Sequence, residues 1–113
     1  MAKKVKSQAK PKRQTIPKER SQKILAKVPE EYIFRCYGGM TFRDLKELAA
    51  GLATMSDDVF DHHVNQEKND FYNWVRDVIE DIELANALLR AASRVQAVEC
   101  VTSRLALLTS SLE

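Results

Sequence analysis

The chain contains neither proline nor glycine after Gly51, so the residues that most readily interrupt a helix are missing from the rest of the sequence. Over this part, apolar residues recur at the three- and four-residue steps of a helix. The most regular run comprises Leu84, Leu88, Ala91, Val95, Val98, Val101, Leu105, Leu108 and Leu112. Because nothing interrupts this run, it predicts one long helix from about residue 81 to 110 in a mainly α fold.

Such a helix would be roughly 42 Å long, which is more than a domain this small can cover by itself. Two arrangements would bury its apolar stripe. One is a homodimer in which the helix packs against a second copy, and the other folds the helix back across its own domain. We expect the dimer, with an interface formed by Leu88, Val95, Val98, Leu105 and Leu108.

A short strand-like stretch precedes the helical part. Tyr32, Phe34 and Cys36 alternate with Ile33, Arg35 and Tyr37, and Gly38-Gly39 follows. Because a tight turn between strands needs positive φ, this pattern predicts a β-hairpin over residues 31–42 that must lie on helices. We expect helix caps at Thr41, at Ser56, and at Asn69 or Asp70. The predicted fold class is therefore α+β, mainly α, with a short hairpin and a long C-terminal helix.

Charge divides the chain into two parts. Residues 1–27 carry ten basic side chains and one acidic one, a net charge of +9, whereas residues 28–113 carry eight basic and fifteen acidic ones, a net charge of −7. We expect residues 1–27 to be a basic, largely disordered tail, since residues 1–15 have almost nothing to bury, with Pro17 suited to the start of a short helix at 17–28. We expect residues 28–113 to form an acidic α-rich domain. The ten basic residues are Lys3, Lys4, Lys6, Lys10, Lys12, Arg13, Lys18, Arg20, Lys23 and Lys27.

Lysines on a flexible chain neutralise phosphates and give salt-sensitive binding with little sequence preference. The tail therefore predicts binding to nucleic acid or a ribonucleoprotein, with ribosomal RNA the favoured partner. No aromatic residue precedes Tyr32, so the tail itself cannot stack on bases. An acidic protein, an anionic lipid surface and a merely solubilising tail are the alternatives. The second function hypothesis is a protein–protein adaptor whose acidic helical body binds the partner.

Polar residues gather between two predicted helices, at His63, Asn65, Lys68, Asn69 and Asp70, with Trp74 close behind. We expect these residues to form a structural corner or a partner-binding surface. A metal or catalytic site at Cys36, His62 and His63 is the alternative, but a metal needs three or four convergent ligands and no such pattern is present. The sequence thus predicts no enzyme, metal, cofactor or small-molecule substrate.

Cellular location follows from composition and cysteine usage. The apolar runs are much shorter than the ~20 residues that span a bilayer, so we expect no membrane association. We expect a cytoplasmic protein in which Cys36 and Cys100 are reduced, a disulfide between them being the alternative.

The stretch from Glu31 to about Leu89 resembles a small uncharacterised domain of archaea and bacteria, classed as a domain of unknown function. The matching segments are Phe42–Leu48, Met55–Phe60, His63-Val-Asn65, Lys68-Asn-Asp-Phe71, Asn73–Asp77 and Leu84-Ala85. The resemblance implies a compact α-rich module with an interaction role and no assigned reaction. That family often has glycine before the aspartate that follows the Trp74 helix, where this chain has Glu80, so the resemblance leaves open a break before Asp81.

Overall fold

Helices dominate the computed structural model, which describes residues 16–113, so the prediction of a mainly α fold with a short hairpin is confirmed. Of the tail predicted over residues 1–27, residues 1–15 lie outside the described residues. The short helix expected at 17–28 is present as α2. In chain order the elements are α2 (Lys18–Leu25), η1 (Glu30–Tyr32), β1 (Phe34–Arg35), β2 (Thr41–Phe42), α3 (Leu45–Thr54), α4 (Asp57–His63), α5 (Asp70–Trp74), η2 (Val75–Ile79), α6 (Ile82–Arg90) and α7 (Arg94–Ser110).

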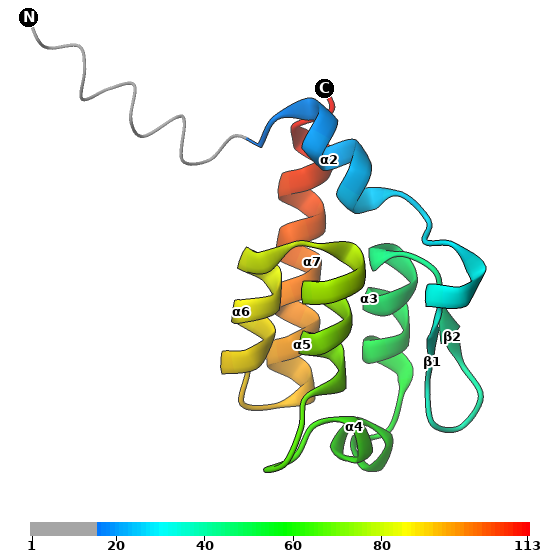
Figure 1. The fold of residues 1–113 in the computed structure, drawn as a ribbon. Coiled ribbons are helices and arrows are strands. Elements are labelled where there is room, and N and C mark those ends of the chain that lie inside the picture. Colours follow the sequence, from blue (N-terminus) through cyan, green and yellow to red (C-terminus); the bar gives the residue numbers. More distant parts are fainter. Residues whose placement is uncertain (1–15) are drawn as a thin grey trace, which may run out of the picture.

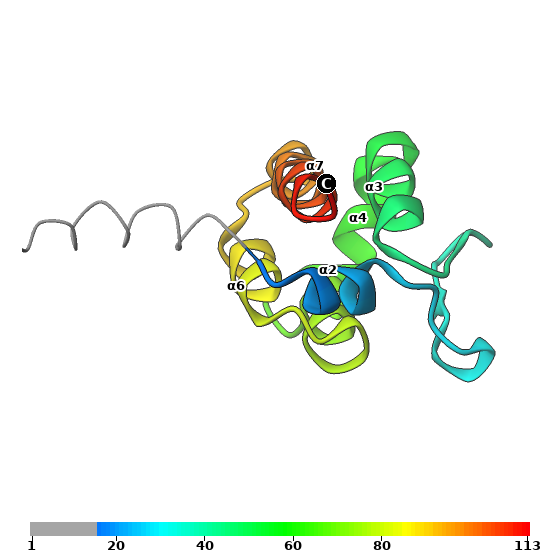
Figure 2. The same cartoon turned by 90° about the horizontal axis from the view of Figure 1, so that it is seen from above.

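The helices α3, α5, α6 and α7 stand side by side as a bundle (Figure 1). Viewed from above, α3 and α7 form one layer and α5 and α6 form the other, while α2 lies across one end (Figure 2). The core between the layers is aliphatic and aromatic. It includes Leu48 and Leu52 from α3, Phe71 from α5, and Val101 and Leu108 from α7. No helix within residues 16–113 is both long enough and apolar enough to cross a membrane.

The β-hairpin lies on the flank of α3. Its strands are antiparallel and pair Phe34 with Phe42, and Gly38 and Gly39 take φ angles of +94° and +111° in the turn, so the predicted hairpin is confirmed. The Phe42 ring lies directly against Gly51 in α3, where a Cβ atom would overlap the ring. Glycine inside this helix therefore lets the hairpin approach closely.

Side-chain caps begin several helices, as expected at Ser56 and Asn69, but the first cap is not Thr41. Asp44 caps α3 by accepting a hydrogen bond from the Glu47 N–H at 2.9 Å, and the Glu47 carboxylate accepts one from the Arg43 N–H at 2.8 Å. The prediction at Thr41 was wrong because Thr41 belongs to β2, where it pairs with Arg35.

The single helix predicted from about 81 to 110 is divided into α6 and α7, which is a correction to the sequence-based expectation. Ser93 caps α7 by accepting from the Gln96 N–H at 3.2 Å, and the Gln96 side chain accepts from the Ala92 N–H at 2.8 Å. This reciprocal pair is a capping box, which starts a new helix without proline or glycine. The two helices then fold back, so that α7 packs on α3 and α6 of its own chain.

A buried ion pair joins α6 to α7. Asp81 is completely buried, and its carboxylate accepts hydrogen bonds from Arg104 Nε at 2.7 Å and Nη2 at 2.9 Å. The same carboxylate caps α6 by accepting from the Leu84 N–H at 3.3 Å. The two-pronged geometry and the cap together satisfy a charge that would otherwise be costly to bury.

The break between η2 and α6 is set by Glu80, which has φ +67° and ψ +38°, a left-handed conformation. The Glu80 and Asp81 N–H groups both donate to the Val75 carbonyl, which closes the preceding helical turn. The helix therefore ends at this point although residue 80 is glutamate and not glycine.

Replacing Arg104 with methionine should leave the Asp81 carboxylate buried without its cation while keeping most of the aliphatic stem. We expect Arg104→Met to lower the free energy of unfolding by about 3 kcal/mol in urea denaturation. Arg76→Met is the matched control because Arg76 pairs with Asp77 on the exposed surface, and it should have a much smaller effect. Equal losses for the two variants would contradict a special role for the buried pair.

Glycine at position 80 should relieve the left-handed strain, whereas alanine keeps the Cβ atom that causes it. We expect the free energy of unfolding of Glu80→Gly to be about 1 kcal/mol higher than that of Glu80→Ala. Both variants remove the same carboxylate, so thermal and urea unfolding of the pair isolate the backbone effect. An alanine variant as stable as the glycine variant would refute the strain.

Candidate functional site

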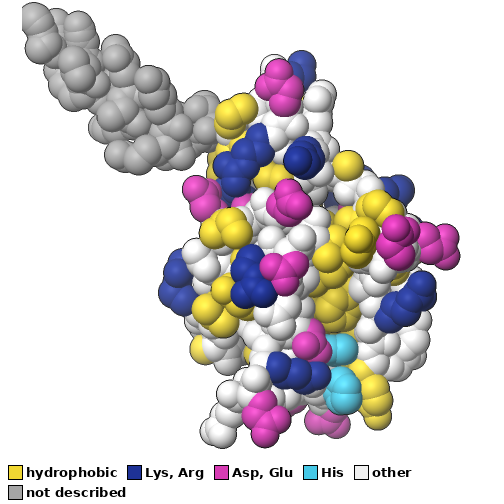
Figure 3. Space-filling view, viewed as in Figure 1, with side chains coloured by type: hydrophobic (Ala, Val, Ile, Leu, Met, Phe, Trp, Pro, Cys, Tyr) yellow, Lys and Arg dark blue, Asp and Glu magenta, His cyan; other side chains and the backbone are white. Residues whose placement is uncertain are grey.

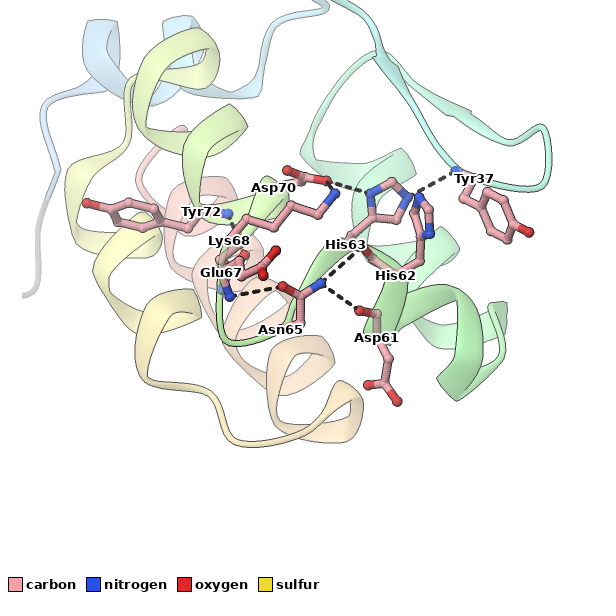
Figure 4. Close-up of polar contacts among 10 residues, drawn as sticks. Tyr37, Asp61, His62, His63, Asn65, Glu67, Lys68, Asp70 and Tyr72 are labelled. Carbon is pink, nitrogen blue, oxygen red and sulfur yellow. Dashed lines mark hydrogen bonds and ion pairs between the residues drawn. The ribbon is translucent and has the colours of Figure 1, made fainter.

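The predicted corner lies where α4 ends and α5 begins (Figure 4). Asn65 shapes it: the side-chain amide donates to the Asp61 carbonyl at 3.2 Å and accepts from the Glu67 N–H at 3.0 Å. The backbone then closes with a hydrogen bond from the Asn65 N–H to the Lys68 carbonyl at 2.9 Å. Asn69 caps α5 by accepting from the Tyr72 N–H at 2.9 Å. These local bonds place His63 and Asp70 facing each other across the corner.

His63 is buried and bonded at both ring nitrogens. Nε2 lies 2.9 Å from the Tyr37 backbone nitrogen, and Nδ1 lies 2.9 Å from Asp70 Oδ2. Because a backbone N–H can only donate, Nε2 must be the acceptor, which places the proton of a neutral ring on Nδ1. Nδ1–H then donates to the Asp70 carboxylate. His63 therefore ties the hairpin to the start of α5 through these two bonds.

A histidine oriented by a carboxylate is also the arrangement of a general base. In such a site the second ring nitrogen must be open to the substrate proton. Here the Tyr37 N–H occupies that position, so His63 has no free lone pair to accept a proton or bind a metal. The geometry of the corner therefore supports a structural role: His63 joins Tyr37 of the hairpin to Asp70 of α5, and we call these three residues the clamp.

Asp70 is held by two donors. Burial disfavours its charged form, but hydrogen bonds from Lys68 Nζ at 2.9 Å and from His63 outweigh this effect and lower the pKa of the carboxyl below its ordinary value. The charge on Asp70 is thus largely matched by its neighbours, which affects what the surrounding surface can attract.

Trp74 lies in the core, and its indole N–H donates to the Tyr32 carbonyl at 2.8 Å. Beside it runs a groove of about 420 Å³ between the hairpin and α5, with an apolar floor that includes Ile33, Phe34 and Val78. Figure 3 shows an apolar surface that continues upward from the two histidines.

The cysteines are free, and Cys36, which follows β1 in the hairpin, is buried. Burial raises the pKa of the Cys36 thiol, and the Tyr37 backbone offsets only part of the increase, so the thiol stays protonated near neutral pH and is a poor nucleophile. Within residues 16–113, no group of three or more His, Cys, Asp or Glu side chains is placed to hold a metal ion.

Only four of the predicted phosphate-binding residues are described. Lys18, Arg20 and Lys23 lie exposed on α2, whereas Lys27 pairs with Asp44 at 3.2 Å and with Glu47 at 3.8 Å. Lys3, Lys4, Lys6, Lys10, Lys12 and Arg13 lie outside the described residues.

The residues predicted for a dimer interface do not share one exposed surface. Leu88 and Leu108 are 3% and 0% exposed because they pack in the chain's own core, while Val95 is 58% exposed. Val98 and Leu105 are partly buried against that core. The break at residues 91–93 explains the difference, because the apolar stripe is carried by two helices that face each other.

Sequence reasoning missed two features near the corner. The exposed Tyr37 ring stacks on His62, with ring centroids 4.2 Å apart and an interplanar angle of 17°. Arg94 begins α7 and donates to the Leu52 carbonyl and to the Asp57 carboxylate, both at 2.8 Å, which joins α7 to α3 and α4. The sequence pattern could not predict that Tyr37 stacks on a residue 25 positions later, because the contact depends on the tertiary fold.

Neutralising Asp70 should weaken the clamp in a pH-dependent way. Because its pKa is lower in the folded chain than its ordinary 3.8, its stabilisation is full above that value and disappears as pH falls through the folded pKa. We expect Asp70→Asn to cost about 1–2 kcal/mol at pH 7, and the difference from wild type to shrink in acid. Urea unfolding at a series of pH values from about 6 to 2 measures this difference. A gap that stays constant through that range would contradict the assignment.

No protein-family model, curated protein or solved structure matches the chain. The resemblance to the uncharacterised archaeal and bacterial domain therefore remains a prediction. What the chain does must be argued from the contacts of its own residues.

Proposed function

We propose that this protein is a non-enzymatic, cytoplasmic factor that binds nucleic acid or a ribonucleoprotein such as the ribosome through basic residues at its N-terminus. The observation that carries this proposal is the arrangement of α2. Its Ser21 and Ile24 are buried against the bundle, while Lys18, Arg20 and Lys23 face outward. Lysine and arginine side chains are visible at this end of the molecule (Figure 3).

The docking of α2 gives the basic segment a fixed starting point. α2 packs on α7 and α3, and Ser21 and Ser111 share a hydrogen bond between their hydroxyl groups. Six further basic residues and no acidic ones precede Ile16 in the sequence. Cations on a fixed helix and on the segment before it would together neutralise several phosphates of one strand.

The ion pairs within residues 16–113 show which basic side chains already contact a carboxylate and which are available to bind phosphates. No carboxylate of these residues lies within 4.0 Å of the Lys18 or Arg20 charges, and Lys23 is 3.9 Å from Glu80 in an exposed pair. Lys27 holds the buried end of Asp44, so we assign it a structural role. The proposal needs no dimer, because α7 packs on its own chain.

Protein binding by the acidic body is the second candidate function. The observation that favours it is the groove beside the hairpin, whose lining combines apolar side chains with charged and polar ones. The apolar residues are Ile33, Phe34, Trp74 and Val78, and the others are Arg35, His63, Asp70, Asn73 and Asp77. Capture of a partner that survives both nuclease treatment and deletion of the N-terminal segment would favour this candidate.

Charge reversal on α2 should weaken binding to RNA. We expect Lys18→Glu/Arg20→Glu to reduce affinity for an RNA duplex by about ten-fold, and deletion of residues 1–15 to reduce it further and flatten its salt dependence. Fluorescence anisotropy between about 50 and 200 mM salt measures both quantities.

Arg90→Glu is the control for α2, since Arg90 is exposed at the opposite end of the bundle. It should bind like the wild type. Binding that survives both the deletion and the reversal, or that does not respond to salt, would rule out the proposed role of the basic residues.

A further inference from the structure

We infer that the tip of the hairpin carries a stacking site for one nucleobase of a single-stranded segment, formed by Tyr37 on His62 with Arg35 beside it. The inference rests on the proposed function and deepens it, because it gives the body a contact that reads bases, whereas the basic segment contacts only phosphates. Its starting observation is the Tyr37–His62 stack, which neither the core nor the clamp requires.

The Tyr37 ring is the outer member of the stack. Its inner face lies on His62 at a centroid distance of 4.2 Å, yet the residue is still 58% exposed. Figure 4 shows the His62 ring between His63 and Tyr37. A nucleobase could therefore extend the stack on the outside, and such stacking tolerates any base because each has a π face.

The ring is held in place before any ligand arrives. The Tyr37 N–H is bonded to buried His63, and His62 lies against the His63 ring edge to face, with centroids 5.1 Å apart at 84°. Gly38 and Gly39 turn the chain directly after Tyr37. A ring that is already ordered loses little conformational entropy when a base stacks on it.

A cation lies on the same face of the hairpin. Phe34 and Cys36 are buried, whereas Arg35 in β1 and Tyr37 in the turn that follows are both exposed. Two positions of separation place the Cα atoms of Arg35 and Tyr37 at most about 7 Å apart, which brings the Arg35 guanidinium within reach of a phosphate next to the stacked base. Within the described part of the chain, no carboxylate oxygen lies within 4.0 Å of the Arg35 guanidinium. The guanidinium is therefore available to a phosphate.

The carboxylates near the stack do not oppose a polyanion. Asp70 is bonded by Lys68 and His63, and the Asp61 side chain points away from the two rings (Figure 4). The Asp70 charge is therefore matched, and the Asp61 carboxylate is directed away from the rings on which a base would stack. An exposed aromatic ring with an adjacent free cation is the combination that single-strand binding surfaces use.

The test compares two probes of equal length, a single-stranded RNA and an abasic oligonucleotide that keeps the phosphates but lacks bases. We expect Tyr37→Ala in the full chain to lower affinity for the RNA about five-fold or more and to leave affinity for the abasic probe unchanged. Tyr37→Trp should restore RNA binding, and its added fluorescence should be quenched by the RNA and not by the abasic probe.

Tyr32→Ala is the matched control, because Tyr32 is 53% exposed but has no ring partner among the described residues. It should bind both probes like the wild type. Tyr37→Ala keeps the N–H that His63 accepts, so its thermal unfolding should match that of the wild type.

Wild-type affinity for both probes in Tyr37→Ala, an equal loss for both, or no quenching in Tyr37→Trp would overturn the stacking site while leaving phosphate binding intact. A wild-type chain that binds neither probe would instead refute the proposed function itself. The two failures are therefore distinguishable in one set of titrations.

Discussion

The buried pair between Asp81 and Arg104 fixes the arrangement on which the rest of the bundle depends. It connects the first turn of α6 to the C-terminal half of α7, directly after the left-handed residue Glu80 reverses the chain. Burial lowers the pKa of Arg104, but Asp81 and Glu83 outweigh this effect and raise it, so the Arg104 guanidinium stays charged. A pair held this way tolerates little rotation of one helix against the other, because any shift exposes one charge to the core without its partner.

A series of contacts links α7 to the hairpin. Arg94 joins the start of α7 to the end of α3, and α3 presents Gly51 to the Phe42 ring of the hairpin. His63 then holds the hairpin tip from the other side through the Tyr37 N–H. The hairpin is too short to be stable alone, so its position is set by α3 and by the corner between α4 and α5.

Local patterns predicted the elements better than they predicted the contacts between them. The alternation around Phe34 and the Gly38-Gly39 turn were sufficient for the hairpin, since both signals are local. The apolar stripe from Leu84 to Leu112 led to the wrong prediction of a single helix. The stripe continues across the break because α6 and α7 both face the same core. Ser93 and Gln96 carried the decisive local signal, a capping box that starts α7. The partners of His63 could not be predicted, because Tyr37 is bonded to it only through the tertiary fold.

The hydrogen bond from the Tyr37 N–H to His63 explains two features of the corner. His63 and Asp70 are arranged like a catalytic pair but His63 has no free ring nitrogen, and the Tyr37 ring lies on the surface. Nε2 of His63 is engaged by the backbone of Tyr37, so the histidine's bonding capacity is used to hold the hairpin, and the Tyr37 side chain is directed to the surface. Two carboxylates of this face are likewise engaged, Asp70 by Lys68 and His63 and Asp77 by Arg76. A net charge of −7 on residues 28–113 therefore does not by itself repel a polyanion from this face, because what the polyanion meets is the local pairing of charges and not their sum.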